Sequence, residues 1–497
     1  MKRKLTTVLL VIALALMVVW GQGGHVAADN PFHTYSYDYW HDPVPQPASY
    51  LYEDALGGPL DGQWLKSAED IFLDDSILYI ADTGNNRIVR LDTGDGSATS
   101  IDEVNGCEPN TLNKPQGVFV DHNGNLWIAD SGNNRILMLE NEKDVLHIIT
   151  KPESDLFPEE VAFVPTKVVV DEADRVYCIS YGVNMGLLEF DLDGEFQGYI
   201  GATQVKVNPF DYMWKRYFAT DMQKERMQSY IPTEYSNITL TDGIFLLSTV
   251  SNLNAEDIRN GADAIRLLNP TGTDILRRLS NYPIVGDLSR EGFEVEYSKF
   301  VDSSSTDFGT YFVLDNNNGK VFAYDNDGNS LFVFGGKGNR KGNLVDPISM
   351  ELSDDLQTIY ILDRSLNAVI RYRQTDYGKT LLTSIRANRM GNNRLANEGW
   401  NKILKFNANS EVAYTGIGKA LLSEGEYKNA MDSFELANNR EYYTKAFKFH
   451  RRAVMQKYFP IFATTVIAII VLALIIHVYK KVLKKVKEIV IYEKQTR

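Results

Sequence analysis

The tetrapeptide Gly-Asn-Asn-Arg occurs three times in this chain of 497 residues, at 84–87, 132–135 and 391–394. In the first two copies an aspartate stands two residues before the glycine, at Asp82 and Asp130. A carboxylate, two amides and a guanidinium so close together can bind a polar ligand. The same groups can instead hydrogen-bond a tight loop into shape. The sequence leaves both interpretations open, and they depend on the secondary structure around each copy.

Side chains that would support catalysis or bind a metal ion are scattered along the sequence. Segments 191–195 and 325–329 begin like calcium loops, but position twelve is alanine or glycine and not the required glutamate. No nucleophile-elbow, metalloprotease or P-loop motif occurs. We therefore predict no catalytic residue, no metal and no cofactor. The histidines outside the two ends of the chain share no spacing motif: His33, His41, His122 and His147.

The two aspartates belong to a repeat. The interval between Asp82 and Asp130 recurs between Asp315 and Asp363. Each aspartate closes a run rich in β-branched and aromatic residues, namely ILYIAD, NLWIAD, TYFVLD and TIYILD. Because short strands and hairpin turns surround these runs, each unit predicts four strands, which is typical of a propeller blade.

Six such units fill residues 66–376, so we predict a mainly β protein with a six-bladed β-propeller there. The last unit holds only three strands, and a missing outer strand would leave an unpaired edge. The N-terminal segment 29–65 contains SYLYEDALG at 49–57, which we predict to supply that strand and close the ring. The predicted blades span about 66–112, 114–160, 164–201, 230–282, 297–344 and 345–376.

Two stretches carry a family resemblance. KPQGVFVDHNGNLWIADSGNNRILML at 114–139 and, more weakly, FGGKGNRKGNLVDP at 334–347 resemble the NHL-repeat family of β-propellers. The resemblance extends over roughly 60–376. It implies a six-bladed, NHL-type propeller. Such propellers include lyases and lactonases, and a gluconolactonase-type site would need Glu and Asn or Asp side chains around one divalent ion.

Candidate binding residues gather on one face of the predicted propeller. Loops after the second and fourth strands of a blade open on the same face, so this face carries both Gly-Asn-Asn-Arg loops and the long connection 202–236. In that connection Trp214, Phe218 and Met222 recur every four residues, as along one side of an amphipathic helix. This stripe could cover the propeller or dock a partner, and the insertion 251–263 reaches the same rim. The candidate binding residues are Asn85, Asn86, Arg87, Asn133, Asn134, Arg135, Trp214, Lys215, Arg216, Phe218 and Met222.

A second repeat, with a helical unit of about 34 residues that is typical of tetratricopeptide proteins, follows the propeller. Gly391 and Gly425 are one such unit apart, as are Trp400 and Phe434. GIGKALLSEGEYKNAMDSFELA at 416–437 resembles the tetratricopeptide pattern, so we predict a small α-helical module at 377–457. In this setting Gly391 is predicted to end a helix, and the third Gly-Asn-Asn-Arg becomes a turn between helices.

The two ends of the chain predict export and membrane anchoring. Residues 1–28 read as a signal peptide, with an uncleaved anchor as the alternative. Residues 458–479 lack Asp, Glu, Lys and Arg and predict one transmembrane helix. The tail 480–497 carries a net charge of +5 and is expected to stay in the cytoplasm. Of the total charge of −14, the signal contributes +3 and the tail +5, which leaves −22 for 29–479 and disfavours nucleic-acid binding.

The whole arrangement resembles NHL proteins of Gram-positive bacteria that accompany carbohydrate uptake systems. That resemblance implies a single-pass cell-membrane protein with most of its mass outside, acting as a binding or scaffold component of an ABC-type uptake system. Its partner would be a transporter permease or a solute-binding protein, and a carbohydrate is a possible ligand. The alternative is a surface hydrolase or lactonase that acts on sugars. The two cysteines, Cys107 and Cys178, exclude a disulfide framework.

Overall fold

The computed structural model describes residues 34–201, 235–250, 253, 262–280, 283–287 and 297–495. The chain divides into two compact units, 1–382 and 383–497, which are described separately below. The predicted signal peptide lies outside the described residues, and so do Trp214, Lys215, Arg216, Phe218 and Met222.

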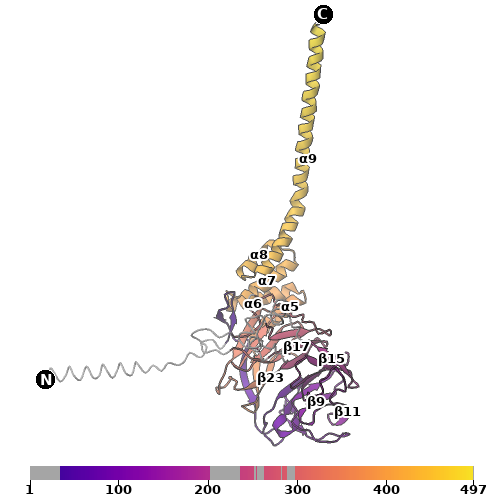
Figure 1. Cartoon of the computed structure of the whole chain (residues 1–497). Helices are drawn as coiled ribbons and strands as arrows, with labels where there is room; N and C mark the ends of the chain where they lie inside the picture. The colour runs from indigo at the N-terminus through magenta and orange to yellow at the C-terminus, as the bar shows by residue number, and fades with distance from the viewer. Residues whose placement is uncertain are drawn as a thin grey trace, which may run out of the picture. The chain divides into compact units, whose positions relative to one another are not determined.

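The first unit contains six antiparallel sheets (Figure 1). The first sheet consists of β4 (Asp70–Asp74), β5 (Ile77–Asp82), β6 (Arg87–Asp92) and β7 (Ala98–Ile101). The second consists of β8 (Gly117–Val120), β9 (Leu126–Asp130), β10 (Arg135–Glu140) and β11 (Asp144–Ile149). The third consists of β12 (Pro165–Val170), β13 (Val176–Ser180), β14 (Leu187–Phe190) and β15 (Phe196–Ile200).

The remaining sheets depart from this simple order. The fourth has three strands, β16 (Asn237–Thr241), β17 (Phe245–Thr249) and β18 (Ile265–Leu268). The fifth has six, β19 (Phe300–Ser305), β20 (Tyr311–Asp315), β21 (Lys320–Tyr324), β22 (Ser330–Gly335), β1 (Thr34–Tyr37) and β2 (Pro43–Pro45). The sixth has β23 (Pro347–Leu352), β24 (Thr358–Asp363), β25 (Ala368–Gln374) and β3 (Tyr50–Leu56).

The first strand of each blade contacts the first strand of the next. The contacts run from β4 to β8, β12, β16, β19 and β23, and β23 contacts β4 again. Six sheets whose innermost strands form a closed ring are a six-bladed β-propeller, which confirms the predicted fold class.

The N-terminal segment closes this ring. Strand β3 pairs antiparallel with β25, with Tyr52 opposite Tyr372 and Leu56 opposite Val369. The prediction that 49–57 supplies the outer strand of the last blade is therefore confirmed. Strand β1 also pairs with β22 of the fifth blade, which the sequence analysis did not predict. Its four residues are too few to show the alternating pattern of a strand.

We expected four strands in each unit, but the described residues of the fourth blade form three. The expectation is wrong for this blade. After β18 the chain makes one bridge, between Leu268 and Asp274. The side chain of Asp274 accepts hydrogen bonds from the backbone N–H groups of Leu267 (3.1 Å) and Leu276 (3.0 Å). A side chain thus takes the place of backbone partners, so no regular fourth strand forms here.

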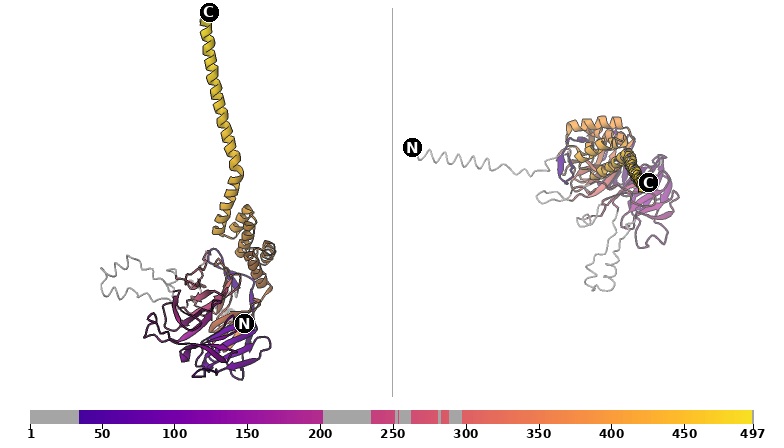
Figure 2. Two further views of the ribbon diagram at one scale, coloured as in Figure 1. Left: turned by 90° about the vertical axis from the view of Figure 1, so that its right-hand side faces the viewer. Right: turned by 90° about the horizontal axis from the view of Figure 1, so that it is seen from above.

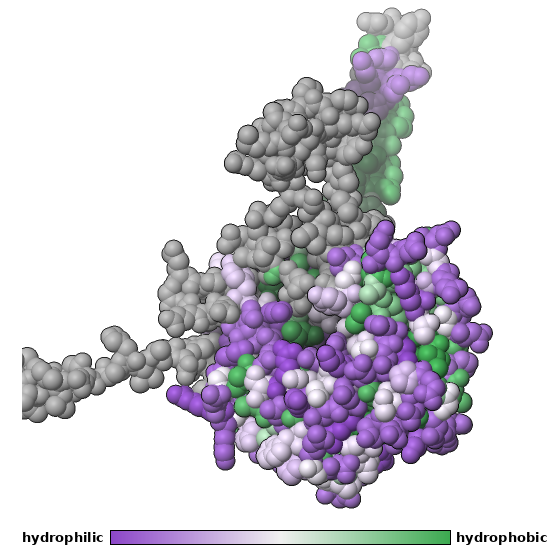
Figure 3. All heavy atoms as spheres, turned by 60° about the horizontal axis from the view of Figure 1, so that its bottom comes forward, coloured by the Kyte–Doolittle hydropathy of each residue, from purple (hydrophilic) through white to green (hydrophobic). Residues whose placement is uncertain are grey.

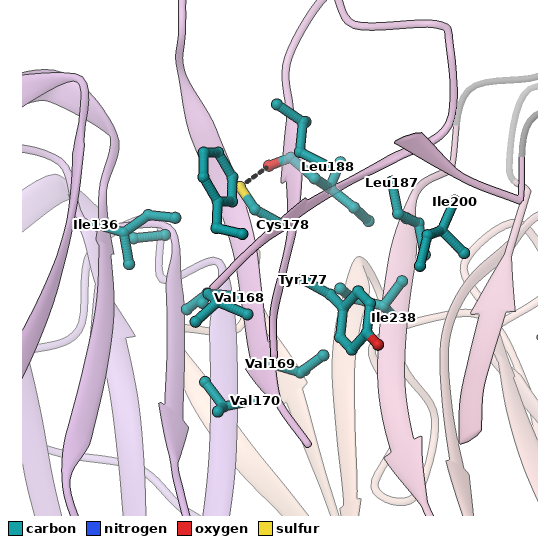
Figure 4. Packing of buried hydrophobic residues seen from close by; sticks show 14 of the residues in the cluster. Ile136, Val168, Val169, Val170, Tyr177, Cys178, Leu187, Leu188, Ile200 and Ile238 are labelled. Carbon is teal, nitrogen blue, oxygen red and sulfur yellow. Dashed lines mark hydrogen bonds between the residues drawn. The ribbon is translucent and has the colours of Figure 1, made fainter. Parts of the chain in front are cut away.

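The hydrophobic core runs between the blades. Around the third blade, Cys178 is buried beside Ile136, Val168 and Leu188, and its thiol lies 3.2 Å from the carbonyl oxygen of Ile179 (Figure 4). Central strands such as β9 are buried on both faces, which explains their almost unbroken apolar sequence. Cys178 acts here as a core residue.

The second unit is helical. Its helices contact one another in chain order from α6 to α9. Gly391 has a φ of +74°. The side chain of Asn392 caps α6 by accepting from the N–H of Leu395 at 3.2 Å. The third Gly-Asn-Asn-Arg is therefore a turn between helices, as predicted. The helices are α5 (Asp376–Arg389), which crosses the boundary between the units, α6 (Asn393–Phe406), α7 (Glu411–Ser423), α8 (Tyr427–Leu436) and α9 (Arg440–Gln495).

Helix α9 is continuous over 56 residues (Figures 1 and 2). Its part from Arg440 to Glu488 is long and apolar enough to cross a membrane. The large apolar side chains of 458–479 are mostly exposed, as expected of a surface that meets lipid. In Figure 3 this helix is hydrophobic along one stretch and hydrophilic beyond it. In the sequence, a cluster of lysines follows residue 479. The predicted transmembrane helix 458–479 is thus part of a longer helix that begins at Arg440, inside the predicted helical module 377–457.

Candidate ligand-binding site

The first Gly-Asn-Asn-Arg loop is held together by its own side chains. Asp82 Oδ2 accepts from Arg87 Nε at 2.7 Å and from Asn85 Nδ2 at 2.8 Å. Arg87 is buried, and its guanidinium also donates to the carbonyl oxygens of Leu60 (3.2 Å) and Gln63 (3.0 Å). These contacts confirm that Asp82 and Arg87 shape the loop.

The second loop repeats this arrangement. Asp130 Oδ2 accepts from Arg135 Nε and from Asn133 Nδ2, both at 2.8 Å. Asn134 is exposed and has a φ of +55°, and Asn86 in the first loop has a φ of +56°. Asparagine tolerates this left-handed conformation better than most residues, which accounts for its recurrence. A part for these loop residues in ligand binding stays a prediction, because none of them lines the pocket described next.

A pocket of ≈ 290 Å³ lies where the innermost strands of the six blades begin. It receives side chains from every blade, because each first strand enters the ring at this end. Most of the lining is polar, and Val301 and Ile348 add a small apolar part. The lining residues are Glu69, Gln116, Thr166, Lys167, Ser236, Asn237, Lys299, Val301, Asn316, Ile348 and Arg364.

Behind this lining, polar side chains form one buried network. Asp70 of the first blade and Lys167 of the third form an ion pair. The hydroxyl of Ser349 lies 2.9 Å from Asp70 Oδ1 and 2.8 Å from Asp302 Oδ2, so it bridges two carboxylates. Asp302 Oδ1 also accepts from the side-chain amide of Asn237. These side chains tie five of the six blades together at the centre of the ring, and Asp70 Oδ2 also accepts from the backbone N–H of Val118 in the second blade at 3.0 Å.

Asp302 and Lys167 of this network both have shifted pKa values. Burial raises the pKa of Asp302 to about 6; the Lys167 ammonium opposes the shift and the Asp70 carboxylate adds to it. Hydrogen bonds from the backbone N–H of Met350 and from the hydroxyl of Ser349 to Asp302 also oppose the rise of its pKa. Burial lowers the pKa of Lys167, but Asp70 and Asp302 outweigh it and the net shift is upward. Lys167 therefore stays charged.

Mild acid is expected to stabilise the propeller. Burial raises the pKa of Asp302 and of Asp315 to about 6 each. In the unfolded chain both lose their protons near pH 4, so between about pH 4 and 6 the folded state holds more protons. The stabilisation is full below the unfolded pKa and is lost as the pH rises through 6. Lowering the pH from 7.5 to 5.5 should add about 1 kcal/mol per group to the free energy of unfolding.

Thermal unfolding of the full chain in detergent at the two pH values checks this expectation. Asp302→Asn cannot take up the proton, so its share of the gain, about 1 kcal/mol, should disappear in that variant. A thermal unfolding midpoint that falls or stays constant when the pH is lowered from 7.5 to 5.5 would contradict the raised pKa values of Asp302 and Asp315.

The blades approach one another closely beside the pocket. A Cβ atom on Gly117 would lie 2.7 Å from the carbonyl oxygen of Thr166 and 3.0 Å from the Cα of Lys167. Both neighbours are backbone atoms of the next blade, so they cannot rotate away. Gly117→Ala is therefore expected to destabilise the propeller by about 1–3 kcal/mol, measured by urea unfolding. Gly57→Ala, whose Cβ would meet Ala368 Cβ at 3.4 Å, should stay close to wild type; equal losses in the two variants would refute the close approach.

The carboxylates at the pocket do not form a site for a divalent ion. Both oxygens of Glu69 accept from Arg364 Nη1, at 2.9 and 3.1 Å, and Asp70 is paired with Lys167. Lys299 adds another ammonium to the lining. Within the described ranges, no group of three His, Cys, Asp or Glu side chains is arranged to hold a metal ion. The donor set required of a gluconolactonase-type site does not fit these residues.

Sequence reasoning missed the residues at the centre of the ring. It singled out the loops on this face but not Asp70, Lys167, Asp302 or Ser349. A usable pattern existed, because Asp302-Ser303-Ser304-Ser305 places four polar residues in a strand that is largely buried. A polar residue near the start of an innermost strand faces the central channel in a propeller, and that criterion would have found all four.

Comparison with known proteins gives one family match. The model described as SMP-30/gluconolactonase/LRE-like region matches residues 65–168. A search of curated proteins found no match to the chain. The matched stretch comprises the first two blades and enters β12 of the third.

Solved structures of similar shape include enzymes of different kinds. Virginiamycin B lyase from Staphylococcus aureus is 13% identical, with 66% of this chain and 100% of that chain covered and a TM-score of 0.39. A gluconolactonase from Xanthomonas campestris is 10% identical, with 69% and 97% covered and a TM-score of 0.40. Likenesses of this degree carry no argument about the chain. Residues 65–168 of this chain are similar to the SMP-30/gluconolactonase/LRE-like region.

Proposed function

We propose that the protein is a membrane-anchored binding protein whose pocket takes a small, hydroxyl-rich ligand of the sugar type. The observation that carries this proposal is the pocket itself, in which amide, hydroxyl and charged side chains from six blades converge. A sugar ring presents hydrogen-bond donors and acceptors around its rim and apolar C–H groups on its faces. The polar lining suits the rim, and Val301 with Ile348 suits a face.

We further propose that the protein serves a carbohydrate uptake system of the ABC type. Helix α9 supports membrane attachment, because part of it is long and apolar enough to cross a bilayer. The lysines that follow residue 479 favour a cytoplasmic C-terminus, with the propeller outside the cell. The partner would be a transporter permease or a solute-binding protein. This partnership rests on the resemblance of the sequence to NHL proteins that accompany such systems.

Sugar binding depends on side chains that reach into the pocket. Gln116→Ala removes an amide from the lining and should weaken sugar binding about 3- to 10-fold, the value of one or two neutral hydrogen bonds. Isothermal titration of the full chain in detergent with a panel of monosaccharides measures the effect. The matched control is Gln197→Ala on strand β15, outside the pocket, which should bind as wild type does. If the wild type, Gln116→Ala and Gln197→Ala bind sugar with equal affinity, the pocket is not the sugar-binding site.

The partner is tested by pull-down. The tagged chain is recovered in detergent from cells of the source organism, and the bound proteins are identified by mass spectrometry. We expect enrichment of a carbohydrate permease or solute-binding protein over a control that carries α9 and the tail alone. Enrichment of neither would count against a role in uptake while leaving the sugar site intact.

A second candidate function is a lactonase that acts on sugars. The family match over residues 65–168 favours it. The engaged carboxylates of Glu69 and Asp70 favour binding instead, since neither is free to act as a base. Incubation with glucono-δ-lactone decides between them: proton release faster than the spontaneous rate, and lost in Asp302→Asn, would support the lactonase.

A further inference from the structure

The pocket lining divides into groups that are already bonded and groups that are not. Arg364 donates to Glu69 at 2.9 Å and to Asp346 at 2.9 Å, so its charge is balanced by two carboxylates. Lys167 is paired with Asp70. Asn316 donates to Asp346 and to the carbonyl oxygen of Pro347, both at 2.8 Å. These groups build the wall of the pocket.

The unengaged groups come from the second, fourth and fifth blades. In the part of the chain that the structure describes, no hydrogen bond or ion pair engages the Gln116 amide, the Asn237 side-chain oxygen or the Lys299 ammonium. The Asn237 oxygen is left over because the amide nitrogen donates to Asp302 and, at 3.4 Å, to Thr239 Oγ1. Asp302 therefore fixes which end of this amide is left to act as an acceptor.

Lys299 is the cation of the lining that has no carboxylate partner among the described residues. Asp315 accepts from the backbone N–H of Lys299 at 2.8 Å and from the side chains of Ser298 and Asn318, not from the Lys299 ammonium. Lys299 is half-buried at the pocket, and an anionic ligand there would form a charge-assisted hydrogen bond with its ammonium.

We infer that the ligand is an acidic monosaccharide, whose carboxylate pairs with Lys299 and whose hydroxyl groups meet Gln116 and Asn237. This inference rests on the proposed sugar-binding function and specifies its ligand class. The carboxylate needs a cation, and Lys299 supplies one that no carboxylate among the described residues compensates. Hydroxyl groups need a donor and an acceptor, which the Gln116 amide and the Asn237 oxygen provide. A neutral sugar would fill the same space but leave Lys299 unpaired.

Matched pairs of acidic and neutral sugars test the inference. The probes are glucuronate against glucose, galacturonate against galactose, and gluconate against sorbitol, each titrated calorimetrically into the full chain in detergent. At least one acid should bind ten times or more as tightly as its neutral partner, and the preference should shrink as salt is added. Acid and neutral partners of equal affinity would overturn the inference while sugar binding itself stands. If neither kind binds, the inference and the proposed function both fail.

Variants assign the preference to Lys299. Lys299→Met should reduce the acid-to-neutral ratio to near one, and Lys299→Arg should restore most of it. Lys143→Met makes the same change of charge at an exposed turn outside the pocket and should keep the full ratio. A ratio that survives in Lys299→Met, in a protein that unfolds at the wild-type temperature, would overturn the assignment. Acetate that binds as tightly as the sugar acids would also overturn it, because the site would then recognise charge alone.

Discussion

Replacing Tyr50 by alanine is expected to lower the free energy of unfolding by about 3–5 kcal/mol, the range found for large aromatic side chains in well-packed cores. Tyr50 is the first residue of the ring-closing strand β3 and is fully buried. Its ring stacks on Phe334 with a centroid distance of 5.5 Å and meets Phe332 at 6.0 Å. Both phenylalanines belong to β22, so this one side chain fastens the sixth blade to the fifth.

The control for Tyr50 lies next to it in the same strand. Leu51 is 57% exposed and points away from the core, so Leu51→Ala should cost far less. Tyr50→Phe removes only the hydroxyl, which donates to the carbonyl oxygen of Leu356 at 2.7 Å, and should cost about 1 kcal/mol. Urea unfolding of the three variants in detergent measures how far each lowers the free energy of unfolding. A loss in Leu51→Ala as large as that in Tyr50→Ala would mean that strand pairing, and not this contact, holds the ring.

Replacing Lys167 by methionine is expected to cost about 3–5 kcal/mol, because it leaves buried carboxylates without a counter-charge. The side chain of Asp70 is 1% exposed and that of Lys167 is 15% exposed, so water cannot replace the lost partner. The pKa of Asp302 should rise further in this variant, since the Lys167 ammonium holds it down in the wild type. The loss should therefore shrink when the pH is lowered.

A double variant separates the pair from its surroundings. Asp70→Asn combined with Lys167→Met removes both charges, and the double variant should be more stable than Lys167→Met alone. The exposed pair Arg373–Glu53 serves as the comparison, and Arg373→Met there should cost less than about 1 kcal/mol. If Arg373→Met and Lys167→Met lower the free energy of unfolding equally, the buried ion pair of Asp70 and Lys167 stabilises the propeller no more than a surface ion pair does.

The architecture could be predicted because it leaves a periodic trace in the sequence. Strands such as ILYIAD and NLWIAD are apolar runs that end in an aspartate, and that aspartate recurs at one interval because each blade repeats the same hairpin. The ring-closing strand followed from counting, since a blade with three strands needs a fourth. The turn at Gly391 followed from the second period, which placed it between helices.

The site could not be predicted in the same way. Whether Asp70 faces Lys167 depends on how two strands far apart in the chain meet across the ring, and no local pattern records that distance. The recurrent loops attracted attention because they repeat, yet Arg87 and Arg135 are buried and serve the fold. Residues of the pocket differ from blade to blade, from Glu69 in the first to Ile348 in the sixth, so no repeat in the sequence marks them. The residues that repeat therefore belong to the scaffold of the propeller, and the residues that differ between blades line the pocket.

The pairing of β3 with β25 has a consequence for how the chain matures. Tyr50–Leu56 leaves the ribosome early, whereas its partner Ala368–Gln374 is made only after all the other strands of the propeller. At a synthesis rate of about 5–20 residues per second, the first strand waits on the order of tens of seconds for the last. During that interval an unpaired strand is open to association with other nascent chains. Production of this protein should therefore depend on factors that shield its leading segment until synthesis is complete.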